Sequence, residues 1–249
     1  MRYFIQLSYD GTNYSGWQIQ PNAPSIQETL NDALSKILRQ DLNVVGAGRT
    51  DTGVHAKQMF AHFETVEDID CQQLTFRLNR FLPAAIAIQK IFPVTGDAHT
   101  RFSAISRSYE YKIATEKDPF KGAWSWLIEQ PLNLDVMNEC AQLLLGEQDF
   151  SAFSKSGTQT ETNLCNVTEA FFVEGGGLIV FHISANRFLR NMVRAIVGTL
   201  VEVGQNKMDK QRFLEVIENK SRSLAGTSAP AKGLYLTKVI YPESIQLNG

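Results

Sequence analysis

The chain has 249 residues, enough to bury a core as one large domain or two half-size ones. Its formal net charge is −2, with 43% hydrophobic and 20% charged residues, which argues against a protein that is basic throughout. No apolar run approaches the roughly 20 residues that a membrane-spanning helix needs. The chain also starts with an alternating strand pattern instead of a signal peptide. We therefore expect a cytoplasmic protein.

The N-terminal half alternates between strands and helices. Alternating apolar residues predict a strand over 3–9, followed by a turn at 10–13. Ser25 and Glu28 form a capping box before apolar residues at helical spacing, which predicts a helix up to Leu38. The sequence then predicts a strand over 58–63, a helix over 71–81 and a strand over 86–92.

The second half repeats this order loosely. It predicts a strand over 109–115, a hairpin of 165–174 and 178–185 around three glycines, a last strand over 233–241, and helices over 135–145, 186–203 and 210–219. The polar segment 154–163 predicts a mobile loop. Because no Pro/Ser-rich linker separates the halves, we expect two pseudo-duplicated α+β halves, 1–104 and 105–249, whose strands share one continuous sheet.

The most informative segment is the glycine-rich stretch 46–56, which contains Arg49 and Asp51. Glycines allow positive φ and close backbone approach, so their clustering indicates a shaped, functional loop. The spacing does not fit a dinucleotide-binding fingerprint, and Val54 and His55 stand where a P-loop has lysine and Ser/Thr. A guanidinium two residues away favours the ionised carboxylate, which suits a nucleophile or base. An Arg–Asp pair that only fixes a turn explains the residue types about equally well.

Two segments concentrate positive charge. The first contains Arg101 and Arg107 and leads into Tyr109, whose ring could stack on a nucleobase. Tyr111, on the same face of the predicted strand, fits a core position better.

The second basic segment contains Arg187, Arg190 and Arg194 at spacings of three and four, which would place them on one stripe of the predicted 186–203 helix. No acidic residue lies among them. A solvated helix face is the plainer explanation, but the missing acids favour contacts with phosphates.

Cysteine and histidine spacing gives no sign of a bound metal. The three cysteines are odd in number and lack C-x-x-C spacing, and the four histidines form no paired cluster. We expect neither a disulfide framework nor a metal site, and no nucleotide cofactor.

Ordered motifs over nearly the full length make the chain resemble the tRNA pseudouridine synthase A family. Several motifs in one order are more specific than any single one, and the loop around Asp51 shows no departure from the family pattern. The segment 154–163 carries no recognisable signature. The motifs are Tyr9-Asp10-Gly11-Thr12, Gly16-Trp17-Gln18 with Gln20, Gly48 to Ala56, Arg101-Phe102-Ser103-Ala104 with Tyr109, Asp149 to Phe153, Phe188 to Arg194, and Ala229 to Leu236.

The resemblance implies the pseudouridine synthase fold, a mixed, mostly antiparallel sheet with helices and a central RNA-binding cleft. It implies a cofactor-free homodimer that isomerises uridine to pseudouridine at positions 38–40 of tRNA, on the 3′ side of the anticodon stem–loop. Asp51 would then be the catalytic nucleophile. Arg49 would be its partner and would help to hold a flipped-out nucleotide, and Tyr109 would contact the target base.

The residues leave several alternatives open. Asp51 could attack covalently or remove a ribose proton, and both routes need its ionised form. Tyr109 could act as a base, although the ordinary tyrosine pKa of ~10 favours a stacking role. A non-catalytic tRNA-binding module and a glycosidic hydrolase are rival functions. The hydrolase would need a second carboxylate, for which Asp10 and Glu110 are candidates.

Overall fold

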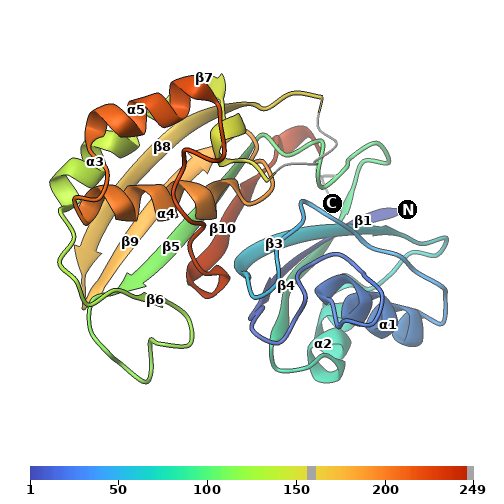
Figure 1. The fold of residues 1–249 in the computed structure, drawn as a ribbon. Helices are drawn as coiled ribbons and strands as arrows, with labels where there is room; N and C mark the ends of the chain where they lie inside the picture. Colours follow the sequence, from blue (N-terminus) through green and yellow to red (C-terminus); the bar gives the residue numbers. More distant parts are fainter. Residues whose placement is uncertain (156–160, 246–249) are drawn as a thin grey trace. The chain divides into compact units, whose positions relative to one another are not determined.

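The computed structural model describes residues 1–155 and 161–245, and the chain forms two compact units (Figure 1). The first unit consists of Met1–Ser106 together with Tyr235–Gly249, and the second is Arg107–Leu234. The last strand therefore belongs to the first unit, whereas the predicted halves place it in the second. As a domain boundary, the predicted division after residue 104 stays a prediction.

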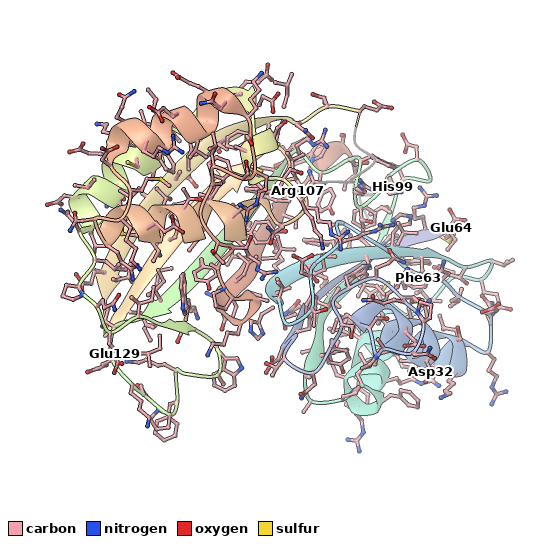
Figure 2. All side chains as sticks on the ribbon, viewed as in Figure 1. Asp32, Phe63, Glu64, His99, Arg107 and Glu129 are labelled. Carbon is pink, nitrogen blue, oxygen red and sulfur yellow. The ribbon has the colours of Figure 1, made fainter. Side chains whose placement is uncertain are left out.

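The first unit is built on a sheet with the strand order β4-β1-β3-β10. Strand β1 (Arg2–Tyr9) pairs antiparallel with both β3 (His55–Glu64) and β4 (Ile86–Val94). Strand β10 (Leu234–Ile240) runs parallel to β3, and the short β2 (Val45–Gly46) pairs antiparallel with β3. At the end of β3, Phe63 is buried and the next residue, Glu64, is exposed; both are labelled in Figure 2.

Two capped helices pack against this sheet. Helix α1 (Ile26–Leu38) begins after Ser25, whose side chain accepts a hydrogen bond from the backbone N–H of Glu28 at 3.2 Å. Helix α2 (Cys71–Phe81) begins after Asp70, whose carboxylate accepts from the next turn in the same way. Figure 1 shows both helices on the same side of the strands. Three sheet residues, Phe4, Phe60 and Phe92, form an aromatic cluster with Tyr241.

The second unit has the strand order β5-β9-β8-β7, with all three pairings antiparallel. The strands are β5 (Ser106–Ala114), β7 (Gly146–Asp149), β8 (Leu164–Gly175) and β9 (Leu178–Ala185), and β6 (Trp126–Leu127) pairs parallel with β5. Helices α3 (Leu134–Gln142), α4 (Met192–Gly204) and α5 (Lys210–Asn219) lie together on one face of this sheet (Figure 1). Short 3₁₀ turns occur at Ser151–Phe153, Ala231–Gly233 and Glu243–Ile245.

Most predicted elements are present, and the α+β class with a mixed, mostly antiparallel sheet is confirmed. Helices α2 and α5 have the predicted bounds. The predicted 186–203 helix is too long at its start, because α4 begins at Met192. Strands β2, β6 and β7 were not predicted, and helix α3 ends at Gln142 before β7 begins. Of the predicted loop 154–163, residues 156–160 lie outside the described residues.

Within residues 1–155 and 161–245, every helix is too short or too polar to cross a bilayer.

Candidate active site

The predicted catalytic carboxylate lies on the loop that joins β2 to β3. Asp51 is partly exposed, and its carbonyl oxygen accepts a hydrogen bond from the backbone N–H of Val54 at 3.1 Å. Gly53, inside this turn, has a φ of 77°. A turn of this kind needs a left-handed residue at its third position, which explains the glycine. The turn thereby fixes the backbone that carries the Asp51 side chain.

The loop that follows β1 holds this turn through backbone hydrogen bonds on both sides of Asp51. The backbone N–H of Trp17 donates to the carbonyl of Thr50 at 3.2 Å. The backbone N–H of Gly53 donates to the carbonyl of Tyr14, also at 3.2 Å. Asp51 therefore lies between two residues, Thr50 and Gly53, whose backbone is hydrogen-bonded to the loop after β1. These bonds fix the position of the backbone that carries the Asp51 side chain.

Two glycines allow the two loops to touch. A Cβ on Gly16 would lie 2.2 Å from the carbonyl oxygen of Thr50, and one on Gly11 would lie 2.0 Å from that of Val54. Gly16 also has a φ of 91°, which an L side chain rarely adopts. The glycines of the Asp10-Gly11 and Gly16-Trp17 motifs are therefore explained by this contact.

The Gly16→Ala variant is expected to have a melting temperature roughly 5 °C below the wild type, because the side chain adds both backbone strain and a clash. Gly48→Ala is the matched control in the same region, since a Cβ there meets no atom within 4 Å. Its melting temperature should stay within about 1 °C of the wild type. Thermal unfolding followed by circular dichroism measures both, and equal values for the two variants would contradict the contact.

The start of α1 stabilises the same loop. The first N–H groups of a helix have no partner within the helix. Here Ile26 N–H donates to the carbonyl of Gly16 at 3.2 Å, and Gln27 N–H donates to that of Trp17 at 3.0 Å. The buried Gln27 side chain also donates to the carbonyl of Val44 at 2.8 Å, just before β2. One capped helix end thus fixes the segments on both sides of the site.

Arg49 lies on the same loop and is exposed. Its predicted roles, which are to favour the charged carboxylate and to hold a flipped nucleotide, stay predictions.

The two tyrosines of β5, in the second unit, have different environments. Tyr111 is fully buried, its hydroxyl donates to the carbonyl of Pro230 at 2.7 Å, and burial raises the pKa of that hydroxyl far above its ordinary value. It is a core residue, as expected. Tyr109 is partly exposed and packs edge-to-face on Phe188, with ring centroids 5.0 Å apart. The predicted contact between Tyr109 and the target base stays a prediction.

The predicted arginine stripe on one helix is wrong. Arg187 and Arg190 lie in the irregular segment before α4, and Asn191 has a φ of 66°, which breaks the helical path. Only Arg194 lies on the helix, and its Nε donates to the carbonyl of Ala229 at 2.7 Å. The stripe therefore does not form, while phosphate contacts by the individual arginines stay predictions.

The remaining predicted arginines lie in different units. Arg107, labelled in Figure 2, donates from Nη1 to the carbonyl of Asn186 at 2.8 Å in the second unit. Arg101 belongs to the first unit, where its guanidinium lies 5.5 Å from the centroid of the exposed Phe102 ring. Their contacts with RNA also stay predictions.

Sequence reasoning assigned no role to His55, which the structure places directly after the Asp51 turn. The residue is buried, and its Nδ1 lies 3.0 Å from a carboxylate oxygen of Asp10. Its position at the end of the Gly48–Ala56 motif was the only signal in the sequence. Among the described residues, no three His, Cys, Asp or Glu side chains are grouped so that they could hold a metal ion.

A sequence profile of the family described as tRNA pseudouridine synthase matches residues 6–103 and 140–242. The chain therefore belongs to the tRNA pseudouridine synthase family, and it is an isomerase. It is 50% identical to the tRNA pseudouridine synthase A of Porphyromonas gingivalis, over 99% of both chains. It is 49% identical to that of Bacteroides thetaiotaomicron, covering 98% of this chain and 92% of the relative. Against that of Thermoanaerobacter sp. the identity is 41%, covering 95% of this chain and 98% of the relative.

Proposed function

We propose that this enzyme isomerises uridine to pseudouridine at positions 38–40 of tRNA, on the 3′ side of the anticodon stem–loop, in the cytoplasm. The observation that carries the proposal is the Asp51 carboxylate, partly exposed on a turn that is anchored at Thr50 and Gly53. Membership of the tRNA pseudouridine synthase family supplies the reaction class.

The reaction suits a single carboxylate. The N1–C1′ glycosidic bond breaks, the uracil turns, and a C5–C1′ bond forms while C5 loses a proton and N1 gains one. Atoms and electrons balance, so the reaction needs no redox partner. Ionised Asp51 would act either by covalent attack or by removing a ribose proton.

The target nucleotide must leave its stack before it can meet a carboxylate on the protein. We propose that Arg49 holds the flipped nucleotide by its phosphate, as an exposed guanidinium can do with two parallel hydrogen bonds. Tyr109 would stack on the uracil. Arg101, Arg107, Arg187, Arg190 and Arg194 would contact phosphates of the stem–loop, reading shape more than sequence.

The test uses purified protein and unmodified tRNA that carries tritium at C5 of uridine. Isomerisation releases the label into water without added cofactor or metal and leaves the tRNA chain length unchanged. Free uracil in the reaction would indicate a glycosidic hydrolase instead. Salt-dependent binding without release from any tRNA would indicate a non-catalytic tRNA-binding module.

We further propose that the enzyme is a homodimer that joins through the second unit. The face of its sheet opposite to α3, α4 and α5 carries Phe171 and Val173 on β8, which are 38% and 51% exposed. Val180 on β9 stands in register with Val173, so the apolar residues are contiguous. Glu110 and Lys112 lie on the same face, on β5. A contiguous exposed apolar face with both charge signs fits a second copy of the chain.

The Val173→Glu variant is expected to be monomeric where the wild type is dimeric, because each two-fold contact would bury two new carboxylates. Light scattering coupled to size-exclusion chromatography measures the mass. Val66→Glu is the matched control, since Val66 is 92% exposed in the first unit and should leave the dimer intact. A monomeric wild type would refute the dimer, and a dimeric Val173→Glu variant would refute this interface.

A further inference from the structure

One buried histidine connects three chain segments beside the proposed catalytic turn. His55 is the first residue of β3, and its side chain is only 3% exposed. Its Nδ1 lies 3.0 Å from a carboxylate oxygen of Asp10, and the backbone N–H of Gly11 points to the same nitrogen at 3.1 Å. The imidazole also stacks on Tyr235 of β10, with ring centroids 4.7 Å apart and planes at 23°.

A continuous path of hydrogen bonds leads from this ring to the Asp51 turn. Gly11, bonded to His55 through its N–H, accepts at its carbonyl from the N–H of Tyr14 at 3.0 Å. The carbonyl of Tyr14 in turn accepts from the N–H of Gly53 at 3.2 Å. Gly53 belongs to the turn that carries Asp51. The position of this turn therefore depends on where the Asp10–Gly11 segment is held.

We propose that His55 is a positioning residue for Asp51, and that its Nδ1 acts by holding the Asp10–Gly11 segment against the start of β3. The inference rests on the proposed catalytic role of Asp51. Because His55 is buried, it acts through the loop and not on the substrate. Small displacements of a reacting group are costly, since about 1 Å can reduce the rate ~10²-fold.

The nitrogen and the ring of His55 can be tested separately. Parallel pairing sets Tyr235 beside His55, so a phenylalanine would keep the ring stack and lose the polar contact. An asparagine places a polar atom close to the position of Nδ1 and loses the stack. His55→Phe and His55→Asn are therefore a matched pair, each of which retains one of the two contacts.

We expect His55→Phe to lower kcat about 10- to 100-fold while KM for tRNA stays within about threefold. His55→Asn should keep kcat within about threefold of the wild type. Asp10→Ala gives a second measurement if the phenylalanine variant does not fold, because the Asp10 carboxylate also holds this segment by accepting from the N–H and the hydroxyl of Thr12. The Asp10 side chain is 40% exposed and tolerates truncation. It should lower kcat without raising KM. Unchanged kcat in His55→Phe or in Asp10→Ala, or an equal loss in His55→Asn, would overturn the inference.

Hydrogen exchange separates this inference from the proposed function. The amides of Gly53 and Val54 should exchange faster in His55→Phe than in the wild type and in His55→Asn. If the wild type makes no pseudouridine but the exchange rates change as stated, the proposed function fails and the positioning role stands. If the exchange rates of these amides do not change, the positioning role fails whatever the activity is.

Discussion

The Asp51→Asn variant is expected to lose pseudouridine formation by about 10⁴-fold or more, the scale seen when a catalytic nucleophile is removed. The amide matches the carboxylate in shape, so the Asp51 turn should remain closed by its hydrogen bond from Val54. What disappears is the negative charge that, in the proposed mechanism, attacks the sugar or base or removes a ribose proton. Tritium release from C5-labelled tRNA measures the loss.

Binding of tRNA should change little in the same variant, because phosphate contacts supply most of the affinity. We expect the dissociation constant to stay within a few-fold of the wild type. Asp41→Asn is the matched control, an exposed carboxylate elsewhere in the first unit that should retain full activity. A normal rate of pseudouridine formation by Asp51→Asn would remove Asp51 from the mechanism.

The Trp17→Ala variant is expected to lower the free energy of unfolding of the first unit by about 3–5 kcal/mol, the range for deleting a large buried side chain. Trp17 is 1% exposed, and its ring lies so close to the backbone of Gly46 that a Cβ there would come within 2.4 Å. The ring also packs beside Tyr9 at 6.3 Å between centroids. Truncation leaves a cavity between the loop after β1 and the start of the loop that carries Asp51.

Urea denaturation followed by circular dichroism measures this change. Phe120→Ala is the control, because that ring is 83% exposed in the second unit and should change stability by no more than about 0.5 kcal/mol. We also expect Trp17→Ala to lose activity below its melting temperature, because without the ring the backbone of residue 17, whose N–H donates to Thr50, can shift into the cavity. Equal stability of the two variants would show that the Trp17 ring does not support the loop.

Local signals were enough to predict several elements from the sequence. Helices α2 and α5 have the predicted bounds because each begins after an aspartate that accepts hydrogen bonds from the first turn. The hairpin between β8 and β9 follows from three consecutive glycines, two of which, Gly176 and Gly177, have positive φ. The glycine clustering around Asp51 indicated a shaped loop, and the structure shows a turn that needs Gly53.

The sequence could not predict features that depend on tertiary structure. The apolar spacing of α4 continues back to Leu189, which is indeed buried, yet Asn191 in the left-handed region starts the helix later. Apolar spacing and helix propensity do not indicate that Asn191 adopts a left-handed conformation, so the helix start and the arginine stripe were predicted wrongly. The stack of His55 on Tyr235 joins two residues far apart in the chain, and no local spacing indicates it.

The return of the final strand to the first unit has a consequence for synthesis on the ribosome. Residues 107–234 are an insertion within the first unit, so they emerge before β10 is available. During translation β3 lacks its parallel neighbour, and the His55 ring lacks the surface on which it stacks. The nascent chain can therefore fold the inserted unit first. The segment that carries His55 and Asp51 gains its last contacts only when the strand that begins near Tyr235 has been made.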